Sequence, residues 1–162
     1  MKTNHKTPSV AAACGLFTNV VLRLAVMLAL LASVSLAQAG LFVKTNNVDN
    51  LNLATSWTNN AAPGAADIAQ WDSTVTDPNN TTNTLGASTT WAGIKILNPA
   101  GPVTIITNSG GNTLTLGAGG IDMSSATADL TMSNNVTLPD RTVQTWSVPS
   151  GRTLSLLSLI HI

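Results

Sequence analysis

The stretch that decides the fold is residues 112–125, which read N-T-L-T-L-G-A-G-G-I-D-M-S-S. Side chains of a strand alternate between its two faces, so Leu114 and Leu116 point to one side and the neighbouring threonines to the other. A glycine-rich corner follows, and then a second short alternating run. One apolar ridge, one tight corner and one more ridge is the unit expected of a coiled-up β architecture.

Further short alternating segments follow each other along the second half of the chain, with Gly, Asn, Pro or Ser at the breaks. They are residues 91–97, 102–107, 129–132, 136–138, 143–148 and 153–160. Strands of this length and spacing are typical of a β-sandwich, a barrel or a solenoid.

Internal similarity favours the solenoid among these folds. Residues 111–116 (G-N-T-L-T-L) resemble residues 151–156 (G-R-T-L-S-L) forty positions later, and Gly93-Ile94 resembles Gly120-Ile121. The many Thr and Asn residues can stack on themselves along successive coils. The sequence therefore predicts an all-β parallel β-helix (β-solenoid) of a few coils, with a β-sandwich as the alternative.

The N-terminus carries the features of a secretory signal peptide. Lys2, Lys6 and Arg23 precede an apolar run over residues 24–36, and Ala37-Gln38-Ala39 supplies small residues at a cleavage site. The apolar run is shorter than the roughly 20 residues that span a bilayer. We therefore predict a signal peptide helix over residues 1–39, cleaved between Ala39 and Gly40; an uncleaved anchor is the alternative.

The composition argues against several classes of site. Only 9% of residues are charged, and from residue 40 onward four basic residues stand against seven aspartates, so a nucleic-acid partner is not expected. The single cysteine, Cys14, precedes the apolar run. The mature chain thus has no thiol for zinc, disulfides or nucleophilic catalysis. No phosphate-binding loop, dinucleotide fingerprint or nucleophile elbow occurs, so no cofactor, metal or catalytic residue is predicted.

Two tryptophans, Trp57 and Trp71, flank a Pro-Gly turn within residues 40–84, which we expect to form an N-terminal cap region. The indoles could cover the open end of the core, or form an aromatic platform for a sugar ring. The structural interpretation is favoured because a stack of repeats needs its first end covered.

Two aspartates flank Trp71 and are the best candidates for a carbohydrate-cleaving pair. Acid/base chemistry on a glycosidic bond uses two positioned carboxyl groups, and Asp67 and Asp72 lie five positions apart. The alternative is that each caps a turn, which is the more common role of such aspartates. Trp57, Asp67, Trp71 and Asp72 are therefore the possible carbohydrate contacts.

The order of motifs resembles the start of bacterial proteins with the autotransporter-associated β-strand repeat. The matching positions are Trp57, 63–67, 71–72, 85–86, Trp91, 93–94, 113–117, 119–121, Val136, Leu138, 144–146, Val148, Gly151 and 153–154. The resemblance implies a right-handed parallel β-helix of the passenger type, exposed at the cell surface.

These observations together predict a non-enzymatic exported surface or structural module of the adhesin or autotransporter-passenger type, secreted or at the cell surface and associated with the outer membrane of a Gram-negative type cell. Its expected partners are surface glycans or other cell-surface proteins, and it would contact the membrane only through the signal peptide. The alternatives are a carbohydrate-active β-helix enzyme, a carbohydrate-binding module and a truncated fragment without independent function. The apolar residues 153–162 predict an open edge that stacks on further repeats or another chain.

Overall fold

The computed structural model describes residues 39–158, 160 and 161. The predicted signal peptide lies almost wholly outside the described residues. Seven strands form one sheet: β1 (Leu41–Val43), β2 (Ile68–Trp71), β4 (Thr89–Ile96), β6 (Thr113–Asp122), β8 (Asn135–Thr137), β9 (Trp146–Ser147) and β11 (Ile160–His161). Four strands form the other: β3 (Thr82–Thr84), β5 (Val103–Ile106), β7 (Leu130–Met132) and β10 (Leu154–Leu156). Two short 3-10 helices, η1 (Ala54–Ser56) and η2 (Pro78–Thr81), complete the described elements.

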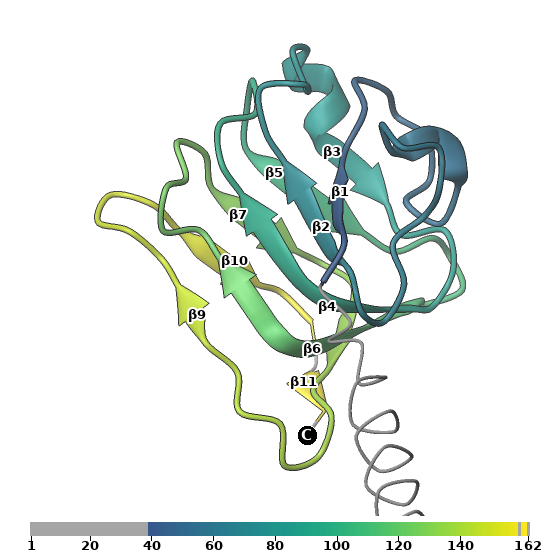
Figure 1. The fold of residues 1–162 in the computed structure, drawn as a ribbon, viewed down its shortest axis with the longest axis vertical. Coiled ribbons are helices and arrows are strands. Elements are labelled where there is room, and N and C mark those ends of the chain that lie inside the picture. The colour runs from purple at the N-terminus through teal and green to yellow at the C-terminus, as the bar shows by residue number, and fades with distance from the viewer. Residues whose placement is uncertain (1–38, 159, 162) are drawn as a thin grey trace, which may run out of the picture. The chain divides into compact units, whose positions relative to one another are not determined.

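The strands are stacked as a parallel β-solenoid of about five turns, which confirms the predicted fold class. The chain passes from one sheet to the other and back, and each strand pairs in parallel with the strand one turn later (Figure 1). Gly93 pairs with Gly120, and Leu114 pairs with Val136. One turn therefore takes 27 residues at the first pair and 22 at the second.

One of the two sequence similarities marks neighbouring turns, and the other does not. Gly93 and Ile94 are the register partners of Gly120 and Ile121. Residues 113–116 lie in β6 of the seven-stranded sheet, whereas residues 154–156 form β10 of the four-stranded sheet. The expectation that these two segments are equivalent units of the repeat is therefore wrong. They lie in different sheets of the solenoid and resemble each other because both alternate apolar and polar residues.

The glycine-rich corner in the opening stretch is a wide bulge between β4 and β6. Trp91 pairs with Leu116, but the next paired residues are Gly93 and Gly120, so β6 carries two more residues than β4 over this interval. Gly120 has a φ of 58°, a backbone conformation that glycine adopts without steric cost. The bulge lets β6 pair with β8 before the corner and with β9 after it.

The core consists of inward side chains that stack from turn to turn. In the seven-stranded sheet Ala69, Ile94, Ile121 and Trp146 are successive register partners. In the four-stranded sheet Asn83, Ile105, Met132 and Leu156 are stacked in the same way. The members in the middle turns are fully buried, and each buried aliphatic side chain contributes about 1.5–3 kcal/mol relative to an exposed one.

The first turn is completed by the segment between β1 and β2. Lys44 and Trp57 form an antiparallel bridge, and the Leu51 amide donates to the Thr84 carbonyl at the end of β3. Leu51 and Trp57 are buried there. This irregular segment therefore lies along the first strands of both sheets, in the region where the sequence predicts a cap.

Candidate functional site

The tryptophans predicted as carbohydrate contacts lie inside the solenoid. Trp57 and Trp71 are 1% and 0% exposed, and they form a cluster with Trp91. The ring centroids of Trp57 lie 5.8 Å from those of Trp71 and 5.9 Å from those of Trp91, both in edge-to-face geometry. Such pairs add about 0.5–1.5 kcal/mol beyond the burial of their area. The three rings thus form the aromatic part of the core.

Both indole N–H groups are used inside the molecule. Trp57 Nε1 donates to the Leu51 carbonyl at 2.9 Å, and Trp71 Nε1 donates to Asn83 Oδ1 at 3.0 Å. Asn83 is itself buried and donates to the Asn80 carbonyl. Stacking on a sugar requires an exposed aromatic face, and neither Trp57 nor Trp71 has one in this structure.

The two candidate aspartates close turns. Asp67 Oδ2 accepts a hydrogen bond from the Gly64 amide at 2.8 Å, which closes the Pro-Gly turn. Asp72 Oδ1 accepts from the Thr74 amide at 2.8 Å, and its Oδ2 accepts from Gln70 Nε2 at 2.8 Å. Both carboxylates thus cap turns, which is the structural alternative to a carbohydrate-cleaving pair.

The pKa of Asp72 is below its ordinary value. Partial burial raises the pKa of this carboxyl group, but the hydrogen bonds from Thr74 and Gln70 lower it by more. A general acid needs a carboxyl pKa near the operating pH. Asp72 is instead held ionised, which suits a group that accepts hydrogen bonds.

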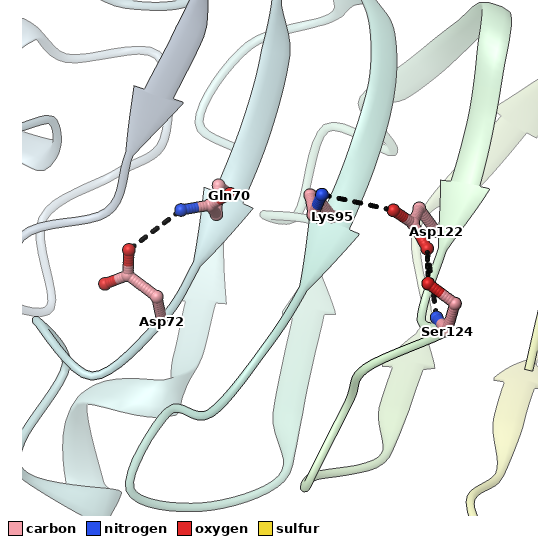
Figure 2. A network of polar contacts seen from close by, with 5 residues as sticks. All are labelled: Gln70, Asp72, Lys95, Asp122 and Ser124. Carbon is pink, nitrogen blue, oxygen red and sulfur yellow. Dashed lines mark hydrogen bonds and ion pairs between the residues drawn. The ribbon is translucent and has the colours of Figure 1, made fainter. Parts of the chain in front are cut away.

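A polar group along the seven-stranded sheet was not predicted from the sequence, and we call it the polar ladder: buried Gln70, partly exposed Asp72, Lys95 and Asp122, and exposed Ser124. Gln70, Lys95 and Asp122 are register partners in β2, β4 and β6, and Figure 2 shows them side by side. Lys95 Nζ lies 3.3 Å from Asp122 Oδ2.

Asp122 is the most fully partnered member of the polar ladder. Its Oδ1 accepts from the Ser124 hydroxyl at 2.6 Å and from the Ser124 amide at 3.0 Å (Figure 2). The hydrogen bonds from Ser124 lower the pKa of Asp122, and Lys95 lowers it further. Asp122 is therefore hydrogen-bonded within its own turn and neutralised by Lys95 of the preceding turn, while Gln70 and Asp72 form a separate hydrogen-bonded pair.

A buried lysine is the second polar feature that sequence reasoning missed. Lys44 follows β1 and is 0% exposed. Its Nζ donates to the Thr45 carbonyl at 3.0 Å, to the Asn47 carbonyl at 2.8 Å and to Asn47 Oδ1 at 2.7 Å. Burial lowers the pKa of Lys44 to about 8, although the nearby Asp49 charge acts in the opposite direction. Lys44 thus holds the first-turn segment together at a cost in desolvation.

In the described part of the chain, no three His, Cys, Asp or Glu side chains are grouped so that they could hold a metal ion. Nor does that part contain a helix long and apolar enough to cross a membrane.

Comparisons with protein-family models, with curated proteins and with solved structures gave no match. The fold and the polar contacts described above are therefore the basis for any functional proposal.

Proposed function

We propose that this chain is a non-enzymatic structural module of an exported protein, similar in role to the passenger region of an autotransporter. The observation that carries the proposal is the polar ladder along the seven-stranded sheet. Lys95 and Asp122 form an ion pair between two successive turns, whereas the Gln70–Asp72 and Ser124–Asp122 hydrogen bonds lie within single turns. An ion pair between turns supports their stacking, which is the property that an extended surface module needs.

Export is the second part of the proposal, and it rests on the sequence of residues 1–39. The basic start, the apolar run and the Ala37-Gln38-Ala39 site are the signals that a secretion machinery reads. An exported chain whose mature part has no cysteine must fold without disulfides, and the backbone pairing and continuous core of the solenoid are suited to this. The module would then be secreted or displayed at the surface.

The proposed partners follow from β10, which is an edge strand of the four-stranded sheet. Leu154 and Leu156 are only partly buried, and Val143, Val148 and Leu157 are exposed. A strand edge with apolar neighbours can pair with another strand. Further repeats or a second chain would cover this edge strand. Surface glycans or other cell-surface proteins are proposed as partners of the remaining solenoid surface.

Localisation is tested by expressing the full chain with a C-terminal tag in a Gram-negative host. The expected result is a mature protein whose N-terminal sequence starts at Gly40, found outside the cytoplasm and degraded when intact cells are treated with protease. An uncleaved protein that stays in the cytoplasm would refute the export proposal.

The non-enzymatic part is tested by screening the purified protein against a panel of polysaccharides. The expected result is no turnover. Hydrolysis that Asp67→Asn or Asp72→Asn abolishes, while Asp129→Asn retains it, would overturn the structural interpretation and favour a carbohydrate-active enzyme.

A further inference from the structure

The first-turn segment brings an amine, an amide and a carboxylate together, and we call them the lysine site: Lys44, Asn47 and Asp49. The buried Lys44 Nζ lies 2.7 Å from Asn47 Oδ1. Because a carbonyl bond is about 1.23 Å long, Nζ lies within about 4 Å of the amide carbon, Asn47 Cγ. Atoms that react with each other approach to about 3–3.5 Å, so a small movement of the amine would bring it into contact with Cγ.

The Asn47 amide is held at both of its ends. Its Oδ1 accepts hydrogen bonds from Lys44 Nζ and, at 3.3 Å, from the Asp49 backbone amide. Its Nδ2 donates to the Thr55 carbonyl at 2.9 Å and to Asp49 Oδ2 at 3.3 Å. A backbone N–H at the oxygen stabilises negative charge that develops there. A carboxyl group at the nitrogen can pass a proton to it.

The Asp49 carboxylate is itself held in place, because the Thr55 hydroxyl donates to its Oδ2 at 2.6 Å. Asp49 is also the charged group whose field acts on Lys44. The residues packed against Lys44 from the other sides carry no charge. They are Trp57 across the antiparallel bridge and Gln70, whose carbonyl accepts from the Lys44 backbone amide.

We propose that Lys44 and Asn47 join in an intramolecular isopeptide bond, with Asp49 as the proton carrier. The lone pair of the uncharged Lys44 Nζ forms a bond to Asn47 Cγ, and the carbonyl electron pair moves onto Oδ1. Asp49 takes a proton from Nζ and passes it to Nδ2. The Cγ–Nδ2 bond then breaks, the carbonyl re-forms, and one molecule of ammonia leaves. The reaction consumes no other reactant, and it does not depend on the proposed export.

Burial makes the uncharged amine available near neutral pH. It lowers the pKa of Lys44 to about 8, so the uncharged fraction rises about tenfold between pH 7 and pH 9. The amine is also hydrogen-bonded to Oδ1 and to the carbonyls of Thr45 and Asn47, and it must leave these bonds to reach Cγ. The reaction is therefore slow compared with an unfolding experiment, and freshly purified protein keeps a free Lys44.

The test is intact-mass spectrometry of the full chain, purified and then kept for several days at pH 7 or at pH 9. The wild-type protein is expected to lose the mass of one ammonia molecule, about tenfold faster at pH 9 than at pH 7. Trypsin should then no longer cleave after Lys44, and fragmentation should place the link between Lys44 and Asn47. Protein kept in urea should not form the link, because the three groups are then apart.

Variants separate the roles of the three residues. Lys44→Arg keeps the positive charge but removes the nucleophile, and it should abolish the loss of ammonia. Asp49→Asn removes the proton carrier and should slow the loss at least tenfold. Lys95→Arg is the matched control and should react as the wild type does. Circular dichroism checks that each variant is folded, and Asn47→Asp, whose carboxylate an amine does not attack, replaces Lys44→Arg if that variant unfolds.

Three outcomes would overturn the proposal. The first is a folded wild-type protein that keeps its full mass at pH 9. The second is a loss of ammonia that persists in Lys44→Arg, or a product that hydroxylamine cleaves, since either would assign the loss to a succinimide formed by an asparagine alone. The third is an Asp49→Asn variant that reacts at the wild-type rate, which would remove the carboxylate from the reaction.

Discussion

Gly93 in β4 lies directly beside Gly120 in β6, and the β6 backbone approaches so closely that Gly93 has no room for a side chain. A Cβ added at Gly93 would lie 2.9 Å from the Gly119 carbonyl carbon and 2.9 Å from the Gly120 oxygen. Both of these are backbone atoms of the next turn. The pair therefore fixes how closely the third and fourth turns can stack at the bulge.

Gly93→Ala is expected to destabilise the protein by about 1–3 kcal/mol, because the added methyl group must push two paired strands apart. Urea unfolding of the full chain, followed by far-UV circular dichroism, measures the change. Gly64→Ala is the control: its Cβ would be 3.5 Å from Asp67 Oδ2, an ordinary contact, and its effect should stay within about 0.5 kcal/mol. Equal stability of the two variants would contradict the close approach.

The strands could be predicted from the sequence because the alternation of side chains is a local property. Leu114 and Leu116 are buried and Thr115 between them is partly exposed, as the pattern indicates. Which strands stack on each other is not local, because turns of the solenoid differ in length. The similarity between residues 111–116 and 151–156 was therefore misleading, since strands of both sheets share the same alternation.

The polar features were harder to predict for the same reason. Lys95 follows Gln70 by 25 residues and precedes Asp122 by 27, so their alignment emerges only when the length of each turn is known. Trp57 and Trp71 are recognisable as a pair in the sequence, but their packing against Trp91 in β4 is not. Nothing near Lys44 in the sequence distinguishes it from a surface lysine.

The burial of three tryptophans predicts how the fluorescence of the protein responds to acrylamide. The chain has four tryptophans, and Trp146 is the one that is only partly buried. Trp146→Phe is expected to leave fluorescence that acrylamide hardly quenches, because Trp57, Trp71 and Trp91 are at most 1% exposed. Strong quenching in this variant would mean that an indole of the interior cluster is accessible, as a sugar platform would require.

Acid should weaken the protein partly through Asp122. Its folded-state pKa lies below the ordinary value of 3.8, mainly because of the hydrogen bonds from Ser124. The stabilisation is therefore complete above the ordinary pKa and is lost as the pH falls through the folded-state pKa. Because Asp122 and Lys95 are both partly exposed, solvent screening limits the effect to at most about 1 kcal/mol.

Asp122→Asn should accordingly reduce the loss of unfolding free energy between about pH 5 and pH 2. Ser124→Ala removes the hydroxyl donor but keeps the amide donor, so its pH profile should lie between those of the wild type and Asp122→Asn. Urea unfolding at a series of pH values gives these profiles. A Ser124→Ala profile identical to that of the wild type would show that the hydroxyl does not stabilise the carboxylate.

Alkaline pH should have the opposite effect, through Lys44. Its pKa is lowered from 10.5 to about 8 by burial, so between these values the unfolded chain binds more protons than the folded chain. The free energy of unfolding therefore rises as the pH increases from about 8 to 10.5, by at most about 3 kcal/mol. Urea unfolding at pH 7, 8, 9 and 10 measures this slope.

Lys44→Met removes the titrating group and should abolish the slope even if the unpaired carbonyls of Thr45 and Asn47 lower the overall stability. Lys95→Met removes the other lysine of the described residues and should retain the slope. A wild-type protein that loses stability over this range, or a Lys44→Met variant with an unchanged slope, would contradict the burial of a charged Lys44.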